Sequence, residues 1–533
     1  MSNASQEADY VIVGAGSAGC VLANRLSESG AASVLLIEAG GRDINPFIHM
    51  PAGISKLIDN PRIDWNYYTE PESELAGRKL YWPRGKVLGG SSSINAMCYI
   101  RGVAGDYDEW RDAGLAGWGY ADVLPYFRKS EDQARGPSDY HGAGGPLSVE
   151  DLRFRNPLSA VFVEAALAAG WSRNEDFNGG SQQGFGFYQV TQRAGRRCST
   201  AVAYLRPALP RPNLRVLRKA NVLRVLLEHG RAVGVEYVSQ GRRETVRATR
   251  EVLLSAGAIG SPQVLLLSGI GPPQDLQAVG VPAQVALPGV GRNLQDHLDF
   301  CTLYKCTRNI TYDFGALQEA AVGLRYLLTG SGPGVSNVAE AGGFARTRFA
   351  TDARADMQFH FVPAQLDDHG RNRLPGHGFT VHACVLRPAS RGHVTLRSAS
   401  ALDPPRIFAG YLSAGDDLAH LLEGVRISRE IVAAGPFAPY RGEEIFPGPA
   451  AVSDEQLRQV VRQKAESIYH PVGTCRMGID EQAVVDANLC VRGVAGLRVV
   501  DASIMPRIIG GNTNAPTVMI AEKAADLIRQ SRS

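Results

Sequence analysis

The sequence predicts an α/β fold, α+β over the whole chain, in which a nucleotide-binding domain is joined to a second domain built on an antiparallel sheet with helices. Three stretches support this prediction. An apolar strand, a glycine-rich turn and a helix follow one another in residues 10–38, and the same alternation returns in residues 251–271. Residues 310–450 instead contain short strand-like runs separated by turns, which are typical of antiparallel sheets.

The composition is that of a large globular protein and argues against several other classes of protein. Of 533 residues, 44% are hydrophobic and 20% are charged, which is enough apolar material for a sizeable core. Basic and acidic residues number 56 and 53, a balance that does not favour a nucleic-acid partner. We expect no signal peptide at the N-terminus, and no apolar run approaches the roughly 18 residues of a membrane span.

The cysteines and histidines show no metal-ligand spacing. The eight cysteines include no C-x-x-C pair, and no H-E-x-x-H motif occurs. We therefore predict no metal site, and reduced cysteines in a cytoplasmic protein. The histidines of the strand-like region, which are His360, His369, His377 and His382, are expected to be structural, with at most one of them on a pocket wall.

The clearest motif lies in the first of these stretches. A strand at residues 10–13 leads into Gly14, Gly16 and Gly19, which form the G-x-G-x-x-G pattern of a Rossmann-like dinucleotide site. Gly14 permits the turn, Gly16 lets the backbone approach a pyrophosphate, and Gly19 lets the helix pack on the strand. Glu38 ends the next strand, where it is placed to bind a ribose diol. A βαβ unit without a ligand is the alternative, and the motif alone does not separate NAD from FAD.

Helix boundaries are predicted at three further places. Ser261 is an expected N-cap, with Pro262 at the first helical position. Ser453 and Gln456 form an expected capping box for a helix over residues 453–468. The amphipathic pattern of residues 516–530 predicts a C-terminal helix.

Longer segments resemble one family from end to end of the chain. "GKVLGGSSSINAMCYIRGVAGDYD" at residues 85–108 and "GAIGSPQVLLLSGIG" at residues 257–271 are similar to the two signature patterns of the glucose–methanol–choline (GMC) flavoprotein oxidoreductases. "VGRNLQDH", "YHPVGTCRMG" and "GLRVVDASIMPRIIGGNTNAPT" extend the resemblance towards the C-terminus. Within the family, the chain most resembles bacterial FAD-dependent alcohol dehydrogenases and choline dehydrogenase.

The resemblance implies FAD as the cofactor. Members with a covalent flavin carry the linking histidine in the stretch corresponding to residues 85–98, which has no histidine here, so we expect non-covalent FAD. Val222 is expected at the adenine, and Asp501 and Ala502 at the phosphate–ribityl region. Motif and resemblance together imply these cofactor-binding residues: Gly14, Gly16, Ser17, Ala18, Gly19, Glu38, Ala39, Trp65, Val87, Gly90, Ser91, Asn95, Ala96, Met97, Val222, Asp501, Ala502, Asn512 and Thr513.

His470 is the candidate catalytic base. A neutral imidazole, with an ordinary pKa near 6.5, is suited to accept a hydroxyl proton. Pro471 disfavours helical backbone at His470, so we expect the preceding helix to end there and to deliver the imidazole to a cavity. A buried structural histidine is the alternative, and the resemblance favours the catalytic histidine of the family.

Asn514 is the second predicted catalytic residue. The resemblance implies a histidine or asparagine as the partner of His470, and we place it at Asn514. An asparagine can hydrogen-bond the alcohol oxygen but is not a base at neutral pH, so His470 is the only predicted general base. Asn514 is also a candidate N-cap, with Pro516 in the first turn of the helix.

The predicted function is oxidation of a primary alcohol to the aldehyde by hydride transfer to flavin N5, with electrons passed to a quinone-type acceptor. One alternative is an oxidase that reduces dioxygen to hydrogen peroxide. Another is a lyase of the hydroxynitrile-lyase kind, which keeps FAD only as structure. We expect apolar or aromatic alcohols rather than choline as substrates. A choline site usually contains an aromatic cage around the ammonium group. The candidates for such a cage are Trp65, Tyr67 and Tyr68, and these residues could equally belong to the hydrophobic core.

The predicted domains are interleaved along the chain. The FAD-binding domain comprises residues 1–158, 197–310 and 465–533, and the substrate domain comprises residues 159–196 and 311–464. Residues 312–335 contain an amphipathic helical pattern. One expectation is a helix that lines the substrate entrance and makes peripheral contact with the inner membrane. A helix packed on its own core is the alternative, which the sequence favours slightly.

Overall fold

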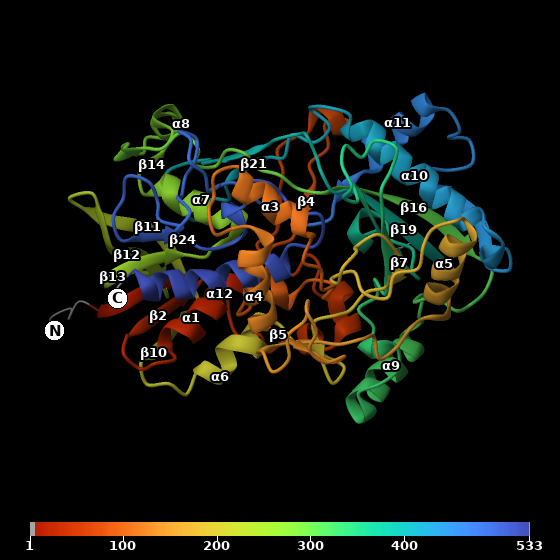
Figure 1. Cartoon of the computed structure of the whole chain (residues 1–533), viewed down its shortest axis with the longest axis horizontal. Helices are drawn as coiled ribbons and strands as arrows, with labels where there is room; N and C mark the ends of the chain where they lie inside the picture. Colours follow the sequence, from red (N-terminus) through yellow and green to blue (C-terminus); the bar gives the residue numbers. More distant parts are fainter. Residues whose placement is uncertain (1–5, 373, 532–533) are drawn as a thin grey trace.

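Two large sheets lie side by side along the long axis of the molecule (Figure 1). The computed structural model describes residues 6–372 and 374–531. The helices are α1 (Ser17–Ser27), α2 (Pro46–His49), α3 (Ala104–Asp112), α4 (Tyr120–Ser130), α5 (Pro157–Ala168), α6 (Arg206–Ala208), α7 (Gly257–Leu267), α8 (Pro273–Ala278), α9 (Ala316–Thr329), α10 (Asp417–Ala433), α11 (Asp454–Lys464) and α12 (Asn514–Gln530).

The first sheet carries the predicted nucleotide-binding unit. Its order is β10-β2-β1-β13-β12-β11, with β24 beside β13. β10, β2, β1, β13 and β24 are parallel, whereas β11 and β12 form an antiparallel meander with the start of β13. The strands are β1 (Gln6–Val13), β2 (Val34–Glu38), β10 (Leu214–Arg218), β11 (Ala220–Glu228), β12 (Arg231–Ser239), β13 (Arg242–Leu254) and β24 (Leu497–Val499). The predicted strand–turn–helix–strand unit of residues 10–38 is confirmed.

The second sheet is antiparallel throughout, as the sequence predicts. Its order is β22-β16-β19-β18-β17-β7, with β23 beside β16, and α10 packs on β16 and β19. The strands are β7 (Gly184–Phe187), β16 (Leu298–Cys306), β17 (Ala341–Ala345), β18 (Met357–Val362), β19 (Gly378–Val385), β22 (Arg441–Phe446) and β23 (Glu466–Ser467). Short pairs complete the fold: β3 (Tyr67–Tyr68) with β4 (Tyr81–Trp82), β5 (Glu131–Gln133) with β6 (Leu147–Val149), β8 (Gln192–Arg193) with β9 (Arg196–Arg197), β14 (Ile270–Gly271) with β15 (Val285–Ala286), and β20 (His393–Thr395) with β21 (Arg406–Phe408).

Helix α7 begins at Gly257, so the predicted start at Ser261 is wrong. Gly257 has a left-handed φ of +80°, which turns the chain from β13 directly into the helix. Pro262 therefore lies inside the helix, where its missing N–H leaves the Ala258 carbonyl unbonded within the helix. The Thr474 hydroxyl donates to that carbonyl at 2.6 Å and so compensates for the proline.

The approach to His470 also differs from the prediction. The capping box of Ser453 and Gln456 is confirmed, but α11 ends at Lys464 rather than at His470. Strand β23 follows and pairs with β16, so a strand of the second sheet leads to the imidazole. At the C-terminus, α12 is confirmed, and its N-cap is Thr513, which makes Asn514 the first helical residue rather than the cap.

Helix α9 projects from the body of the molecule (Figure 1). None of its residues is buried, and Leu317 and Leu327 are 89% and 77% exposed. The alternative of a helix packed on its own core is therefore wrong. Among the described residues, no helix has both the length and the apolar character that a membrane crossing requires.

Candidate active site

A cavity of about 1020 Å³ is lined by both sheets. From the first sheet come the ends of β1 and β2, with Val13 and Glu38, and the turn after β13. From the second sheet come side chains of β16, β18 and β19. The carboxyl ends of parallel strands are the usual place for a nucleotide in such a sheet. The cavity therefore joins a nucleotide site to the antiparallel sheet.

The glycine turn forms a cradle for an anion. Gly14 has a φ of +98°, and a Cβ on Gly19 would lie 1.8 Å from the Gly14 carbonyl oxygen, so only glycine allows α1 to pack there. The N-cap of α1, Gly16, makes no side-chain hydrogen bond, which leaves the first-turn N–H groups for a ligand. The backbone of Gly90 approaches so closely that its Cβ would lie 2.6 Å from Gly16 Cα. These features fit a dinucleotide pyrophosphate.

Glu38 lies at the nucleotide end of the cavity. Its carboxylate accepts the N–H of Ala15 at 2.8 Å and that of Gly40 at 2.7 Å, which fixes its orientation. Burial raises the pKa of Glu38 to about 7. A ribose diol would offer hydroxyl donors to the remaining lone pairs. The other predicted residues on the cavity wall are Ser17, Ala18, Ala39, Trp65, Gly90, Ser91, Asn95, Ala96, Met97, Val222, Asp501, Ala502, Asn512 and Thr513.

Val87 does not reach the cavity, contrary to its prediction as a flavin contact. It is fully buried in a small apolar cluster with Ile48, Ile63 and Leu57, of which only Leu57 also lines the cavity. An apolar residue next to a glycine-rich turn has the same sequence pattern whether it faces a ligand or a core, so the pattern did not decide between them. Its backbone still forms a bridge to Gly41.

Asp501 connects β24 to the N-terminus of α7. One of its oxygens accepts the Gly257 N–H at 2.9 Å and the Ser261 hydroxyl at 2.6 Å. The other accepts the N–H of Ser503 at 2.8 Å. Ser261, predicted as a helix cap, thus holds this aspartate instead. The arrangement places a fixed carboxylate and a helix N-terminus on one wall of the cavity.

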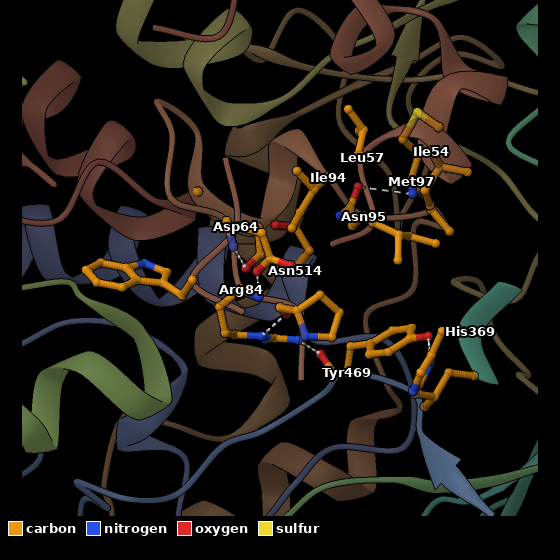
Figure 2. Close-up of a pocket in the computed structure, with 18 of the residues that line it drawn as sticks. Ile54, Leu57, Asp64, Arg84, Ile94, Asn95, Met97, His369, Tyr469 and Asn514 are labelled. Carbon is orange, nitrogen blue, oxygen red and sulfur yellow. Dashed lines mark hydrogen bonds between the residues drawn. The ribbon is translucent and has the colours of Figure 1, made fainter. Parts of the chain in front are cut away.

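The stretch around Asn95 forms a further part of the cavity wall (Figure 2). Asn95 accepts the N–H of Met97 at 3.1 Å, and Arg197 donates to the same amide oxygen at 2.7 Å. Ile94 also lines the cavity. Figure 2 shows Ile94, Asn95 and Met97 near the apolar side chains of Ile54 and Leu57.

His470 belongs to a chain of hydrogen bonds that determines its tautomer. His297 Nε2 lies 3.2 Å from the Leu386 carbonyl oxygen, which can only accept, so Nε2 carries the proton. His297 Nδ1, 3.0 Å from His470 Nδ1, must then accept the proton of His470. His470 Nε2 is left with its lone pair, towards which Asn512 Nδ2 donates at 3.2 Å. Burial, reinforced by His297, lowers the pKa of His470 well below its usual 6.5 and keeps the ring neutral.

Two side chains that the sequence did not single out hold the backbone of this segment. Asp296 accepts the His470 N–H at 2.7 Å and the Ser467 hydroxyl at 2.5 Å. Arg84 donates to the Tyr469 carbonyl at 2.7 Å, as Figure 2 shows. Tyr469 has a φ of +72°, an uncommon conformation for a residue of this size. The imidazole is thus positioned by buried polar contacts on both sides.

Asn512, and not Asn514, is the asparagine beside the imidazole. The Asn512 amide oxygen accepts from Gln358 Nε2 at 3.0 Å, which turns its NH₂ group towards His470. Asn514 instead accepts the Ser17 hydroxyl at 2.7 Å, at the glycine turn. The structure thus places Asn512, rather than the predicted Asn514, in contact with His470, although both asparagines line the cavity. The two asparagines are two residues apart in "GNTNAP", and only the turn before α12 decides which one faces His470.

Other residues of the cavity were missed or misjudged. His297 lies in "VGRNLQDH", a segment noted only for its resemblance, and its neighbour Asp296 belongs to the same motif. Three of the four histidines expected to be structural, His360, His369 and His382, line the cavity. His360 and His382 alternate with apolar residues on β18 and β19, a pattern that would have placed both on one face, whereas His369 lies in the turn of residues 368–370.

A dinucleotide cradle that opens onto a neutral, buried histidine defines a dinucleotide-dependent oxidoreductase. A family model described as GMC oxidoreductase matches residues 8–299 and, in its C-terminal part, residues 388–521. The chain belongs to the GMC oxidoreductase family, and it is an FAD-binding enzyme.

Individual proteins are similar to the chain over nearly its whole length. It is 49% identical to an alcohol dehydrogenase [acceptor] of Pseudomonas putida, over 98% of this chain and 95% of that one. It is 48% identical to the mitochondrial choline dehydrogenase of Mus musculus, over 98% and 89% of the two chains. A variant of Aspergillus oryzae formate oxidase, solved to study FAD modification, matches with a TM-score of 0.92 and 28% identity over 99% and 98%. The enzyme class is thus an FAD-dependent alcohol or choline oxidoreductase.

Proposed function

We propose that the enzyme oxidises a primary alcohol to the aldehyde with His470 as the general base. The single observation that carries this proposal is the hydrogen-bond chain that leaves the lone pair of His470 Nε2 on the cavity side, next to Asn512. A neutral imidazole in this state is ready to take the hydroxyl proton of an alcohol. The proton then resides on Nε2, while Nδ1 keeps its bond to His297.

Bound FAD supplies the acceptor for the hydride of the carbinol carbon. The chain contributes the rest of the arrangement. In this structure Asn512, held by Gln358, donates to His470 Nε2. An alcohol hydroxyl that replaces this contact would donate to Nε2 and accept from Asn512, whose NH₂ group would then stabilise the developing negative charge. Asp296 and Arg84 hold the backbone beside the imidazole, which matters because a misplacement of about 1 Å can cost a hundredfold in rate.

The experiment that tests this function is reduction of the flavin by a panel of alcohols without oxygen. We expect primary alcohols to bleach the flavin, which a lyase that keeps FAD only as structure would not show. Reoxidation by a soluble quinone, faster than by air-saturated buffer, is expected of a dehydrogenase. Stoichiometric peroxide with dioxygen as the faster acceptor would instead identify an oxidase.

Apolar alcohols are the proposed substrates because the aromatic side chains do not form a cage. Trp65 and Tyr67 line the cavity but stack in parallel, with ring centroids 5.7 Å apart. The Lys86 ammonium already lies 4.5 Å from the Trp65 ring, where it would repel a quaternary ammonium. Tyr68 is exposed and bonded to Arg371.

Choline is a second candidate because one wall carries acidic groups. Asp299 and Glu466 lie on paired residues of β16 and β23, and both line the cavity. Burial raises the pKa of Glu466 to about 8, and a bound cation would favour its charged form beside Asp299. These acidic groups therefore suit a cationic alcohol, and choline dehydrogenases are among the relatives. A higher kcat/KM for choline than for medium-chain or benzylic alcohols in the same panel would favour this candidate.

The proposed base predicts an unusual pH profile. Because burial lowers the pKa of His470, the imidazole should stay unprotonated as the pH falls through 6.5. We expect the rate of flavin reduction at saturating alcohol to be nearly constant from pH 8 to pH 6 and to fall only in more acidic buffer. Stopped-flow reduction across this range measures it, and a half-maximal rate near pH 6.5 or above would contradict a depressed pKa.

Helix α9 is the proposed contact with a lipid surface. Leu317 and Leu327 are exposed, whereas Ala316, Ala320 and Gly323 of the same helix line the cavity. An amphipathic helix beside the entrance suits an enzyme whose acceptor is a lipid-soluble quinone. We expect the double variant Leu317→Glu and Leu327→Glu to lose sedimentation with phospholipid vesicles while oxidation with a soluble acceptor continues. Equal sedimentation of the variant and the parent would exclude α9 as the contact.

A further inference from the structure

A cluster of three potential metal ligands lies on the face of the second sheet that borders the cavity. Cys301 of β16 and His382 of β19 are direct cross-strand partners. Asp299 precedes Cys301 by two residues, so its side chain leaves the strand on the same face. All three residues line the cavity. None of them is used by the proposed mechanism.

The three ligand atoms converge on one point. His382 Nδ1 lies 2.6 Å from Asp299 Oδ2 and 3.2 Å from Cys301 Sγ. Cys301 Sγ lies 3.6 Å from Asp299 Oδ2. The second oxygen of Asp299, Oδ1, has no hydrogen-bond partner although the residue is only 3% exposed. A buried carboxylate oxygen without a protein partner is open to a water, a ligand or an ion, any of which would offset its desolvation.

The donor set suits zinc better than magnesium or calcium. Thiolate, imidazole and carboxylate are the ligands of Zn²⁺, whereas the harder cations require oxygen alone. Ordinary Zn–S and Zn–N lengths of about 2.3 and 2.1 Å imply an S···N separation of about 3.6 Å in a tetrahedral site. The Cys301–His382 separation is within about 0.4 Å of that value. The Asp299–His382 pair would open by less than about 1 Å.

The surrounding charges favour a dication. Burial, reinforced by Asp299 and Glu466, raises the pKa of the Cys301 thiol well above its usual value, so the thiol keeps its proton when no cation is present. Glu466 is the cross-strand partner of Asp299, and a divalent ion would favour the charged form of both carboxyl groups and displace the thiol proton when it binds. The pKa of His382 is raised by Asp299 against the effect of burial, and a metal on Nδ1 would replace that contact.

The geometry points to a Zn²⁺ site formed by Asp299, Cys301 and His382, with its fourth position open to the substrate cavity. His470 lines the same cavity, so bound zinc and an alcohol compete for the space between the two sheets. Zinc is therefore an inhibitor of this enzyme rather than its catalyst. Only this inhibition rests on the proposed function, because the site itself is independent of alcohol oxidation.

The test is the zinc content of the FAD-loaded enzyme. Protein stripped with a chelator is dialysed against micromolar ZnCl₂, freed of unbound metal, and assayed for zinc and FAD together. We expect about one zinc per FAD. Cys301→Ala and His382→Ala should each lower zinc retention at least tenfold with FAD content unchanged. Cys306→Ala, in the same strand but outside the cluster, is the matched control and should retain zinc fully.

Several results would overturn the assignment. Parent protein that keeps its FAD but retains no zinc excludes the site. Zinc that persists in both variants and disappears in His369→Ala would belong instead to the neighbouring group of Asp368, His369 and Glu466. If Cys301→Ala loses FAD, Cys301→Ser is measured in its place. Zinc that is retained without raising the apparent KM for the alcohol would exclude competition in the cavity.

Discussion

Replacement of His470 by alanine should abolish most flavin reduction by alcohol while FAD stays bound. The imidazole is buried and its Nε2 lone pair is held next to Asn512, so the variant loses the proton acceptor at the reacting oxygen. Loss of a general base typically costs about 10²–10⁴-fold in rate. Anaerobic stopped-flow measurement of flavin bleaching gives this rate directly, and the visible spectrum reports the FAD content of the same sample.

The two nearby asparagines provide matched controls for this result. Asn512→Ala removes a hydrogen bond at the alcohol oxygen and should slow reduction less than His470→Ala does. Asn514→Ala lies at the glycine turn, bonded to Ser17, and should affect FAD retention rather than the rate per bound flavin. A larger loss of rate in Asn514→Ala than in Asn512→Ala, with FAD retained in both, would favour Asn514 as the catalytic partner of His470.

The substitution Gly90→Ala should abolish most FAD binding. Gly90 has a left-handed φ of +52°, and a Cβ there would lie 2.6 Å from Gly16 Cα. Neither backbone can move away cheaply, because Gly16 is the N-cap of α1 and Gly90 begins the turn of residues 90–93. The two walls of the pyrophosphate cradle would be forced apart. We expect purified Gly90→Ala to contain at most about a tenth of the FAD of the parent protein, an effect of about 1.4 kcal/mol or more on cofactor binding.

Gly30→Ala is the control that separates the clash from the backbone strain. Gly30 also has a positive φ, +75°, but a Cβ there meets nothing within 4 Å. It should therefore cost only the strain of a left-handed alanine, about 1–2 kcal/mol of folding stability, with the FAD content kept. FAD is quantified after denaturation and filtration, which also tests the proposal that it is non-covalent. Equal FAD loss in both variants would mean that strain, not contact with Gly16, controls binding.

The sequence alone determined the parts of this protein that depend on local chemistry. The G-x-G-x-x-G turn, the parallel strands around it and the capping box at Ser453 were predictable because glycine conformations, apolar runs and caps are decided by a few adjacent residues. The antiparallel second sheet followed from short strand-like runs separated by turns, which are also local features. The family and the cofactor followed from longer motifs that span the chain.

Only the tertiary structure decided which residues face the cavity. Asn512 and Asn514 are equivalent in local sequence, and the turn into α12 directs one to His470 and the other to Ser17. His297 contacts His470, which lies 173 residues further along the chain, and no local sequence pattern predicts that contact. The cluster of Asp299, Cys301 and His382 exists only because β16 and β19 pair in one register. Such contacts form when distant segments pack together, so the free energy that stabilises them comes from the whole fold. The sequence of one segment alone therefore does not predict them.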